Sequence, residues 1–223
     1  MSKSLGEFIV KKLSERYKIE KRDFAPLNFE DPFLILISII LSQNTTDKNA
    51  LKAMQNLISN GLIKPEDYLK VSKETLFQLI RPAGLYEQKG ETIIRVARWV
   101  VQKFSGDLRK IKDLKLSEAE KELLSIKGIG EKTKDVFLGF YLGAKTFPID
   151  THIKRVAKRI GIGEGGYKTM KEMLLKTFKD PMKAHMLLIE HGRKTCTARN
   201  PKCDLCPIKE ICRFYKEKIS KDT

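Results

Sequence analysis

Apolar side chains recur along most of the chain at intervals of three and four residues, which is the spacing of one face of an α-helix. Residues 93–104 show this pattern clearly, and no segment shows the sustained alternation of a half-buried strand. The apolar stripe of this segment consists of Ile93, Ile94, Ala97, Val100, Val101 and Phe104, and it excludes Arg95, Arg98 and Lys103. The chain is therefore predicted to be all-α, with short connections between helices.

Short motifs indicate where some of these helices begin. Asp31-Pro32 places a capping carboxylate before a proline in the first turn. The apolar run that follows, Phe33 to Leu41, would span only about 14 Å as a helix, so it predicts a buried helix and not a membrane span. Ser117 and Glu120 have the spacing of a capping box. Asp150-Thr151 is predicted to cap a basic helix that contains Lys154, Arg155, Lys158 and Arg159.

Length and charge narrow the class of protein. With 223 residues the chain can form one large domain or two small ones. Its 44 Lys and Arg exceed its 28 Asp and Glu and give a formal net charge of +16. Residues 1–150 carry 26 basic and 20 acidic side chains, and residues 151–223 carry 18 and 8. Nucleic acid is the natural partner for such a surface, and the alternative is a solvated Lys-rich surface of the kind found in thermophiles.

The first residues do not resemble a signal peptide. Basic side chains recur through the first twenty-two positions, and no cleavable apolar core follows them. We therefore expect a soluble, cytoplasmic protein. Cysteines in that compartment are expected to be reduced and not paired as disulfides.

A short turn joins two helical patterns between Leu123 and Thr133. Gly128 and Gly130, one residue apart, let the chain reverse with positive φ and without an obstructing Cβ. Backbone N–H groups at the start of the following helix are then free to meet a phosphate. The pattern is that of a helix–hairpin–helix, which grips a DNA backbone without reading bases, and an ordinary helical hairpin is the alternative.

Two side chains near this turn are candidates for covalent chemistry. Lys132 falls in the first turn of the second helix, where the helix dipole disfavours a further positive charge and so favours an amine able to attack carbon. Asp150 follows in the segment Ile149-Asp150-Thr151-His152, where a carboxylate held at a helix start could stabilise a cationic sugar. Taken alone, Lys132 could be one solvated lysine among many, and Asp150 only a helix cap.

All four cysteines lie within seventeen residues, with the spacing C-x6-C-x2-C-x5-C. Four thiols this close together in a cytosolic chain predict a metal centre. Structural zinc generally uses two short Cys-x-x-Cys pairs, and only one such pair is present, so the spacing favours an iron–sulfur cluster modestly over zinc. The predicted ligands are Cys196, Cys203, Cys206 and Cys212.

These motifs together resemble the endonuclease III family of the helix–hairpin–helix DNA glycosylase superfamily. The similarity covers roughly residues 30–217 and includes the cysteine spacing, which matches that family's 4Fe–4S pattern. Lys132 in its hairpin and the element around Asp150 are similar to the family's catalytic lysine and aspartate. The other similar segments are Pro32-Phe33, Leu41 to Asp47, Gly84-Leu85-Tyr86, His191 to Cys196 and Asn200 to Cys203.

The resemblance implies two α-helical lobes with double-stranded DNA bound across the cleft between them. A six-helix lobe would comprise residues 25–145, and residues 1–24 and 146–223 would form an iron–sulfur cluster lobe. The protein would be a monomeric, nucleoid-associated bifunctional DNA glycosylase and AP lyase of base excision repair. It would remove oxidised or damaged pyrimidines and nick the strand 3′ to the abasic site.

The resemblance also implies roles for individual residues. Lys132 would attack C1′ of the sugar and form a Schiff base, and Asp150 would support the charge at C1′ and proton transfer. The nucleotide would be flipped out of the duplex. Residues predicted to contact DNA are Gln43, Asn44 and Leu85 at the vacated space, Gly128 and Gly130 at the turn, and Arg199 and Lys202 in the loop between the first two cysteines.

One segment departs from the family pattern. Relatives typically carry a single Gln before Thr-Asp, whereas this chain has Gln43 followed by Asn44, and Asn44 falls at the usual Gln position. This departure affects the lesion and opposite-base preference but not the predicted chemistry. Two alternatives remain: a monofunctional mismatch base glycosylase, against which Lys132 argues, and a non-catalytic DNA-structure-binding protein, which would need neither Lys132 nor Asp150.

Overall fold

The computed structural model describes residues 3–222 and the side chains of residues 5–220. The described residues form helices and short 3-10 turns and contain no strand, so the predicted all-α class is confirmed. The helices are α1 (Lys3–Arg16), α2 (Pro32–Leu41), α3 (Asp47–Ser59), α4 (Pro65–Lys70), α5 (Lys73–Ile80), α6 (Tyr86–Phe104), α7 (Leu116–Ser125), α8 (Glu131–Leu142), α9 (Thr151–Ile160), α10 (Tyr167–Thr177), α11 (Pro181–Lys194) and α12 (Arg213–Asp222). Within the described part of the chain, no helix combines the length and apolar character needed to cross a membrane.

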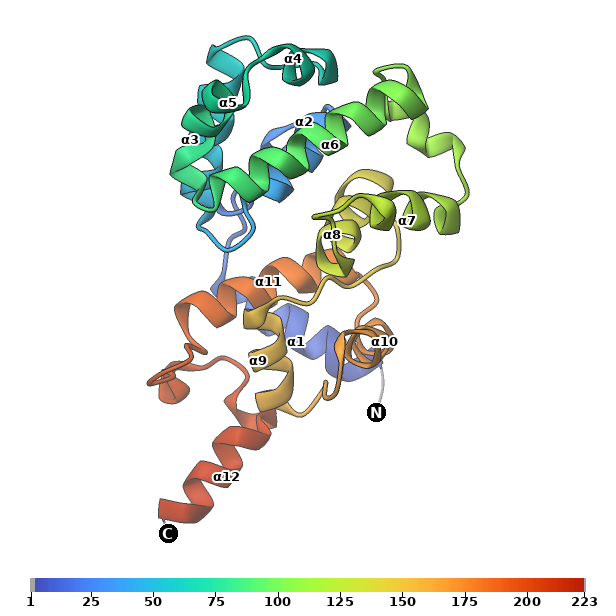
Figure 1. Cartoon of the computed structure of the whole chain (residues 1–223). Coiled ribbons are helices and arrows are strands. Elements are labelled where there is room, and N and C mark those ends of the chain that lie inside the picture. Colours follow the sequence, from blue (N-terminus) through green and yellow to red (C-terminus); the bar gives the residue numbers. More distant parts are fainter. Residues whose placement is uncertain (1–2, 223) are drawn as a thin grey trace. The chain divides into compact units, whose positions relative to one another are not determined.

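The contacts divide the chain into two compact units (Figure 1). The first, which we call the hairpin unit, is Glu20–Ala144. The second, the cysteine unit, combines the described residues up to Ile19 with those from Lys145 onward. The sequence-based boundary at residue 25 differs from the observed one, because the 3-10 turn Lys21–Asp23 packs on the turn Ala25–Asn28 and on α3.

The hairpin unit is built around α2, which is buried along its length except at Leu34. Asp31 starts this helix as predicted, since its side chain accepts hydrogen bonds from the N–H groups of Phe33 at 2.9 Å and Leu34 at 3.2 Å. Helix α6 packs against α2, α4 and α5. The burial of Ile93, Ala97, Val100 and Phe104 on α6 confirms the predicted stripe, which Val96 also joins.

The start of α7 differs from the sequence-based prediction. The helix begins at Leu116, and Glu118 accepts a hydrogen bond from the backbone N–H of Lys115 at 3.1 Å. Ser117 therefore lies inside the first turn and does not cap it. The predicted partner, Glu120, instead lies 3.6 Å from the amine of Lys134 on α8, so the capping box predicted at Ser117 is wrong.

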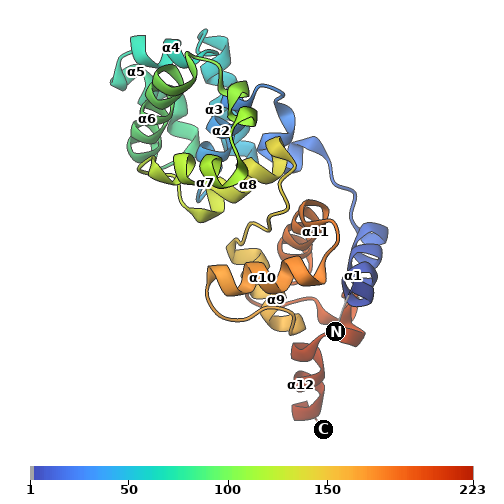
Figure 2. The same ribbon diagram turned by 90° about the vertical axis from the view of Figure 1, so that its right-hand side faces the viewer.

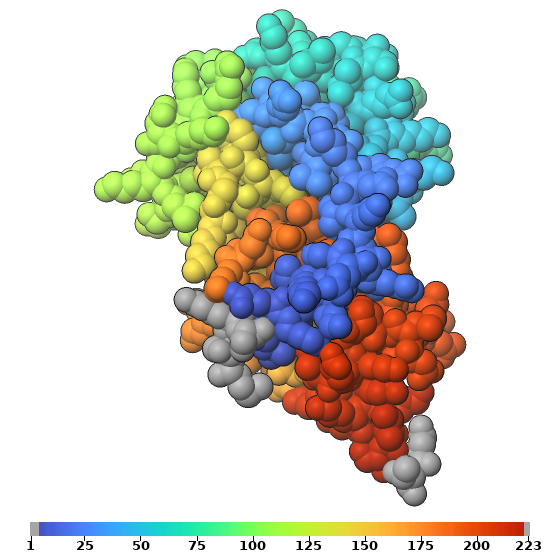
Figure 3. Space-filling view, turned by 180° about the vertical axis from the view of Figure 1, so that it is seen from behind, coloured from blue at the N-terminus to red at the C-terminus, as the bar shows by residue number. Residues whose placement is uncertain are grey.

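The cysteine unit packs α9, α10 and α11 together with α1 (Figure 2). Helix α1 contacts α10 and α11, and a view from the opposite side shows it lying along the C-terminal segments of this unit (Figure 3). Gly6 permits the contact with α10, because a Cβ at this position would overlap the carbonyl of Thr177. Helix α12 contacts α9 near its start and then projects away from the rest of the unit.

Candidate active site and cysteine-lined hollow

The turn between α7 and α8 is fixed by apolar anchors and one special glycine. Ile126 and Ile129 are buried, and the N–H of Ile129 donates to the carbonyl of Ile126 at 3.0 Å. Gly128 has φ +105°, and a Cβ there would collide with the side chain of Thr92 on α6. Only glycine fits this position, because both the backbone conformation and the space exclude a side chain.

Gly130 plays a different part from the one predicted. It is the N-cap of α8 with φ −104° and ψ −179°, an extended conformation that any residue adopts, and a Cβ built on it meets no described atom within 4 Å. It provides no capping side chain, so the first N–H groups of α8 face outward beside an unobstructed backbone. A phosphate could approach this helix start closely.

These two glycines provide a matched test of the turn. We expect Gly128→Ala to lower the free energy of unfolding by about 1–3 kcal/mol, because it adds backbone strain and a collision with Thr92. Gly130→Ala is expected to cost less than about 1 kcal/mol, as a change at an open N-cap. Urea denaturation of both variants measures the difference. Equal stability losses would contradict this description of the turn.

Two lysines lie in the first turns of α8, and their environments differ. Lys134 is buried and its amine lies 2.7 Å from Glu131, 3.3 Å from Asp135 and 3.6 Å from Glu120. Although burial opposes it, the hydrogen bond and the charges of these carboxylates hold the pKa of Lys134 above its usual value. Lys134 is therefore held as a cation, whereas Lys132 is exposed on the first turn beside Gly130. Of the two, only Lys132 presents its amine to an incoming molecule.

The hairpin unit brings Gln43 close to this lysine. The side-chain amide of Gln43 donates to the hydroxyl of Thr133, the residue after Lys132, at 2.9 Å. The next residue, Asn44, is exposed and has a positive φ of 53°. Leu85 also has a positive φ, 47°, and is 51% exposed. Positive φ in residues other than glycine costs free energy and concentrates at functional sites.

Asp150 belongs to the cysteine unit, whereas Lys132 belongs to the hairpin unit. As predicted, Asp150 is the N-cap of α9, and its side chain accepts a hydrogen bond from the N–H of Ile153 at 2.7 Å. The side chain remains partly exposed, so one carboxylate oxygen is oriented by the helix and the group can still meet solvent or a ligand.

The four cysteines are free thiols that line one hollow, together with His191 and Phe214. The space amounts to roughly 380 Å³ including its open side. In the part of the chain that the structure describes, no three His, Cys, Asp or Glu side chains are grouped tightly enough to hold a single metal ion. The four cysteines instead line one shared hollow, and several thiols lining a common space fit a multi-iron cluster.

The charge state of these thiols is coupled to ligation. Burial raises the pKa of Cys206 to about 11, and burial also raises the pKa of Cys212. Thiols bind iron as thiolates, so cluster assembly in this hollow would release protons.

Two arginines of the predicted basic helix α9 hold the loop that carries the first cysteine. Arg155 donates to the carbonyls of Cys196 at 2.9 Å and Gly192 at 2.8 Å. Arg159, one turn later, donates to the carbonyls of Thr197 at 2.7 Å and Ala198 at 3.0 Å, and its Nη1 lies 3.4 Å from Cys196 Sγ. These arginines therefore organise the hollow, while Lys154 and Lys158 on the same helix remain exposed. The sequence did not indicate this structural role.

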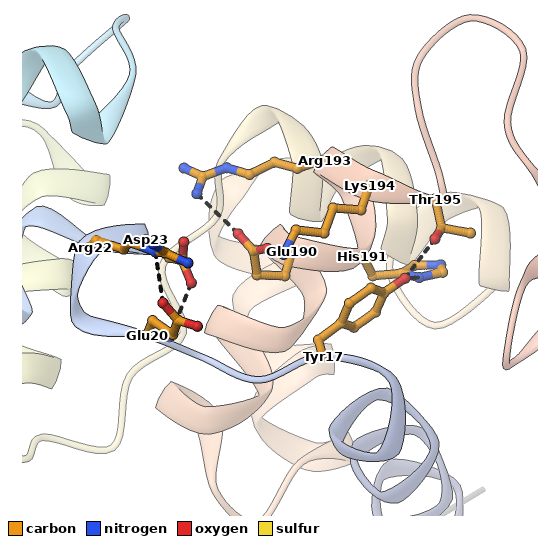
Figure 4. Close-up of polar contacts among 9 residues, drawn as sticks. All are labelled: Tyr17, Glu20, Arg22, Asp23, Glu190, His191, Arg193, Lys194 and Thr195. Carbon is orange, nitrogen blue, oxygen red and sulfur yellow. Dashed lines mark hydrogen bonds and ion pairs between the residues drawn. The ribbon is translucent and has the colours of Figure 1, made fainter.

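A buried polar chain links Tyr17, just after α1, to His191 and Thr195 at the end of α11 (Figure 4), and these last two residues line the hollow. The hydroxyl of Tyr17 lies 2.7 Å from Thr195 Oγ1 and 3.0 Å from His191 Nδ1. Burial lowers the pKa of His191 to about 4, so the ring is neutral at neutral pH. Nδ1 of His191 shares a hydrogen bond with the Tyr17 hydroxyl, and its Nε2 faces Cys206 Sγ at 3.8 Å. His191 thus supports a predicted ligand from behind.

The remaining predicted contact residues lie in the loop between the first two cysteines. Arg199 and Lys202 are both exposed. The loop is closed by the hydroxyl of Thr197, which donates to the carbonyl of Arg199 at 2.6 Å, and by the N–H of Lys202, which donates to the carbonyl of Thr195 at 3.0 Å. Local hydrogen bonds therefore order the backbone of this loop. Among the described residues, no salt bridge to Arg199 or Lys202 is seen.

Comparisons with known proteins agree with this geometry. The sequence profile of HhH-GPD superfamily base excision DNA repair proteins matches residues 37–180, and that of the iron-sulfur binding domain of endonuclease III matches residues 196–212. Endonuclease III from Sulfolobus acidocaldarius is 37% identical over 220 residues, covering 93% of this chain and 95% of the relative. Endonuclease III from Escherichia coli K12 is 35% identical over 198 residues, covering 86% and 88%.

Solved structures are similar over nearly the whole chain. A non-covalent endonuclease III–DNA complex superposes with a TM-score of 0.82 and 26% identity over 99% of both chains. A trapped endonuclease III–DNA covalent intermediate superposes with a TM-score of 0.81 and 25% identity, covering 98% of this chain and 99% of the other. A thermostable thymine-DNA glycosylase, 22% identical with a TM-score of 0.72, shares the fold.

Proposed function

Because the chain belongs to the endonuclease III family of HhH-GPD base excision DNA repair proteins, we propose that Lys132 is its nucleophile and Asp150 the carboxylate that assists it. The protein is a bifunctional DNA glycosylase and AP lyase with an iron–sulfur cluster. The observation that carries the residue assignment is the exposed amine of Lys132 on the first turn of α8, beside an open, glycine-capped helix start.

In the proposed reaction, the amine of Lys132 attacks C1′ of the deoxyribose as the C1′–N bond to the damaged base breaks, and the base leaves with a proton. The C1′–O4′ bond of this adduct then opens, with a proton passing from the attacking nitrogen to O4′, and the sugar becomes an open-chain protonated Schiff base (iminium). The iminium makes the C2′ proton acidic, and loss of that proton breaks the C3′–O bond and expels the 3′ phosphate, which nicks the strand. Water then hydrolyses the imine and frees Lys132. The neighbouring Lys134 cannot replace Lys132, because three carboxylates hold its amine as a buried cation.

Asp150 has two proposed roles, which are to stabilise positive charge at C1′ and to transfer protons as the base leaves. Its orientation by the N–H of Ile153 supports a fixed carboxylate, and a fixed negative group stabilises positive charge that develops at C1′ when the base departs. The same carboxylate accepts or returns protons during departure of the base. Asp150→Asn retains a cap for α9 and removes the charge, so it separates the chemical role of this residue from its structural one.

DNA is held by three groups of residues. The start of α8 after Gly128 and Gly130 binds the phosphate next to the damaged nucleotide through backbone N–H groups. The exposed loops with Gln43, Asn44 and Leu85 fill the space left by the extruded nucleotide and meet the opposite strand. Arg199 and Lys202 add phosphate contacts from the cysteine loop.

The iron–sulfur cluster is bound by Cys196, Cys203, Cys206 and Cys212, which share one hollow. When bound, it supplies a rigid covalent link across residues 196–212 and holds the basic loop in place. Arg155 and Arg159 stabilise the same loop from α9 through its carbonyl groups.

Damaged pyrimidines in duplex DNA are the proposed substrates, and abasic sites serve as intermediates and as substrates for the lyase. We further propose that the protein acts as a cytoplasmic, nucleoid-associated monomer. The excess of positive charge, +16 over the chain, supports association with bulk DNA.

A panel of duplexes, each with one defined lesion, tests this function. We expect excision of oxidised pyrimidines, nicking 3′ to the site, and a borohydride-trapped complex with the same substrates. Duplexes that differ only in the base opposite the lesion measure the opposite-base preference to which Gln43 and Asn44 are proposed to contribute. Release of mismatched normal bases without any trapped complex would instead support a monofunctional glycosylase.

A further inference from the structure

Lys89 is a buried lysine near the start of α6 that the reaction itself does not use. Its side chain is 3% exposed, and its amine donates to the carbonyl of Leu41 at 2.8 Å and to the carbonyl of Ala83 at 2.7 Å. Burial lowers the pKa of Lys89 to about 8. A buried amine is costly, whereas a methionine would fill much of the same space without that cost.

The two carbonyls lie at the ends of two helical segments. Leu41 is the last residue of α2, and Ala83 is the last residue of the 3-10 turn Arg81–Ala83. Carbonyl groups at helix ends lack intrahelical partners, and a cation is well suited to them. One amine thus joins two segments that are distant in sequence.

Each segment leads directly into a proposed DNA-contacting loop. Gln43 and Asn44 follow Leu41, and Gly84 and Leu85 follow Ala83. Asn44, Gly84 and Leu85 all have positive φ, at 53°, 67° and 47°. Such backbone conformations persist where the surrounding contacts fix them, and the two hydrogen bonds of Lys89 lie just before both strained positions.

The first of these loops is also tied to the helix that carries Lys132. Gln43 donates to the hydroxyl of Thr133 at 2.9 Å. The contacts therefore form a continuous series from the Leu85 loop, through Lys89 and the end of α2, to the residue after the nucleophile. A change at Lys89 would shift both loops relative to α8.

We propose that Lys89 is a positioning residue for nucleotide extrusion, holding the Gln43–Asn44 loop and the Gly84–Leu85 loop in register so that both enter the duplex together. The inference rests on the proposed function of those loops. It assigns Lys89 no contact with DNA and no part in bond breaking. Its effect is confined to substrates in which a stacked, paired nucleotide must be displaced.

The test compares duplex and single-stranded substrates in the Lys89→Met variant. Methionine is one atom shorter than lysine, is also unbranched, and removes both hydrogen bonds. We expect single-turnover excision from a lesion-bearing duplex to fall about 10- to 100-fold, as misplacement of positioning groups does. Cleavage of a single-stranded abasic oligonucleotide requires no extrusion, so the ratio of duplex to single-strand rates should fall by a similar factor.

Extrusion is also measured without chemistry. In a Lys132→Gln background, 2-aminopurine placed beside the lesion should brighten on binding of the parent, and adding Lys89→Met should reduce that increase. Lys52→Met on α3 replaces an exposed lysine of the same unit and serves as the matched control. Lys89→Arg keeps the donors and should restore part of the ratio.

The outcomes are distinct. An unchanged ratio with an unchanged fluorescence signal, or equal losses on both substrates, overturns the positioning role. If Lys89→Met does not fold, Lys89→Gln, which replaces the amine by a neutral amide on a shorter side chain, is measured in the same way. Failure of the parent itself to excise the lesion from duplexes, or to be trapped on them, would instead overturn the proposed function.

Discussion

Replacing Lys132 with glutamine is expected to reduce borohydride trapping and strand nicking to background, a loss of at least about 10³-fold. The amide of glutamine cannot form a Schiff base. The fold should be unaffected, because Lys132 is exposed and its neighbours Gly130 and Thr133 are held by contacts that do not involve its side chain. Trapping assays on abasic duplexes, with thermal unfolding in parallel, measure both effects.

Lys127→Gln is the matched control for this variant. Lys127 is an exposed lysine in the same turn, so its replacement removes the same charge and leaves the proposed nucleophile in place. It should weaken DNA binding slightly and retain trapping. A Lys132→Gln protein that traps as well as the parent would contradict the assignment, and loss of trapping in both variants would point to general electrostatics.

The second large effect is expected from Cys203→Ala. Loss of one of the four ligands of the iron–sulfur cluster should remove most of the yellow-brown absorbance of the protein at about 400 nm. The segment 196–212 would lose its covalent link, and with it the fixed placement of Arg199 and Lys202. We expect DNA affinity to fall about tenfold and the cysteine unit to unfold at a lower temperature. Iron content, absorbance and DNA titration measure the change.

Leu205→Ala provides the control within the same segment. Leu205 lies between Cys203 and Cys206 and is 65% exposed, so its truncation removes apolar surface without touching a proposed ligand. It should retain colour and iron. A Cys203→Ala protein that stays coloured, folded and active would show that Cys203 is not a ligand, and zinc in place of iron would give a colourless parent.

Features controlled by neighbouring residues were predictable from the sequence. The starts of α2 and α9 follow from Asp31 and Asp150, because a capping carboxylate acts within three residues of itself. The position of Lys132 in the first turn of α8 follows from the glycine-containing turn before it. The four cysteines could be expected to share one site because they lie within residues 196–212.

Where two neighbouring residues could play the same structural role, the sequence pattern did not show which of them does. Ser117 and Glu120 fit a capping box, yet Glu118 makes the backbone contact because Glu120 lies near Lys134 on the next helix. Gly130 was expected to need a positive φ, but only Gly128 meets a neighbour, Thr92, that excludes a side chain. Both differences arise from packing between helices.

Contacts between distant segments were not visible in the sequence at all. No sequence motif singles out Lys89, and its proposed role depends on carbonyls at Leu41 and Ala83 that only folding brings together. The sequence placed Arg155 in a basic helix, but it did not indicate that this side chain donates to the backbone of Cys196. The contact of Tyr17 with His191 joins opposite ends of the chain.

The most direct test of the account is to identify the residue that is covalently attached to DNA. After borohydride capture on an abasic duplex and digestion with protease and nuclease, mass spectrometry locates the reduced sugar adduct. We expect the adduct on the peptide that contains Lys132, at that side chain. An adduct at the N-terminal amine or at another lysine, with Lys132 unmodified, would contradict it.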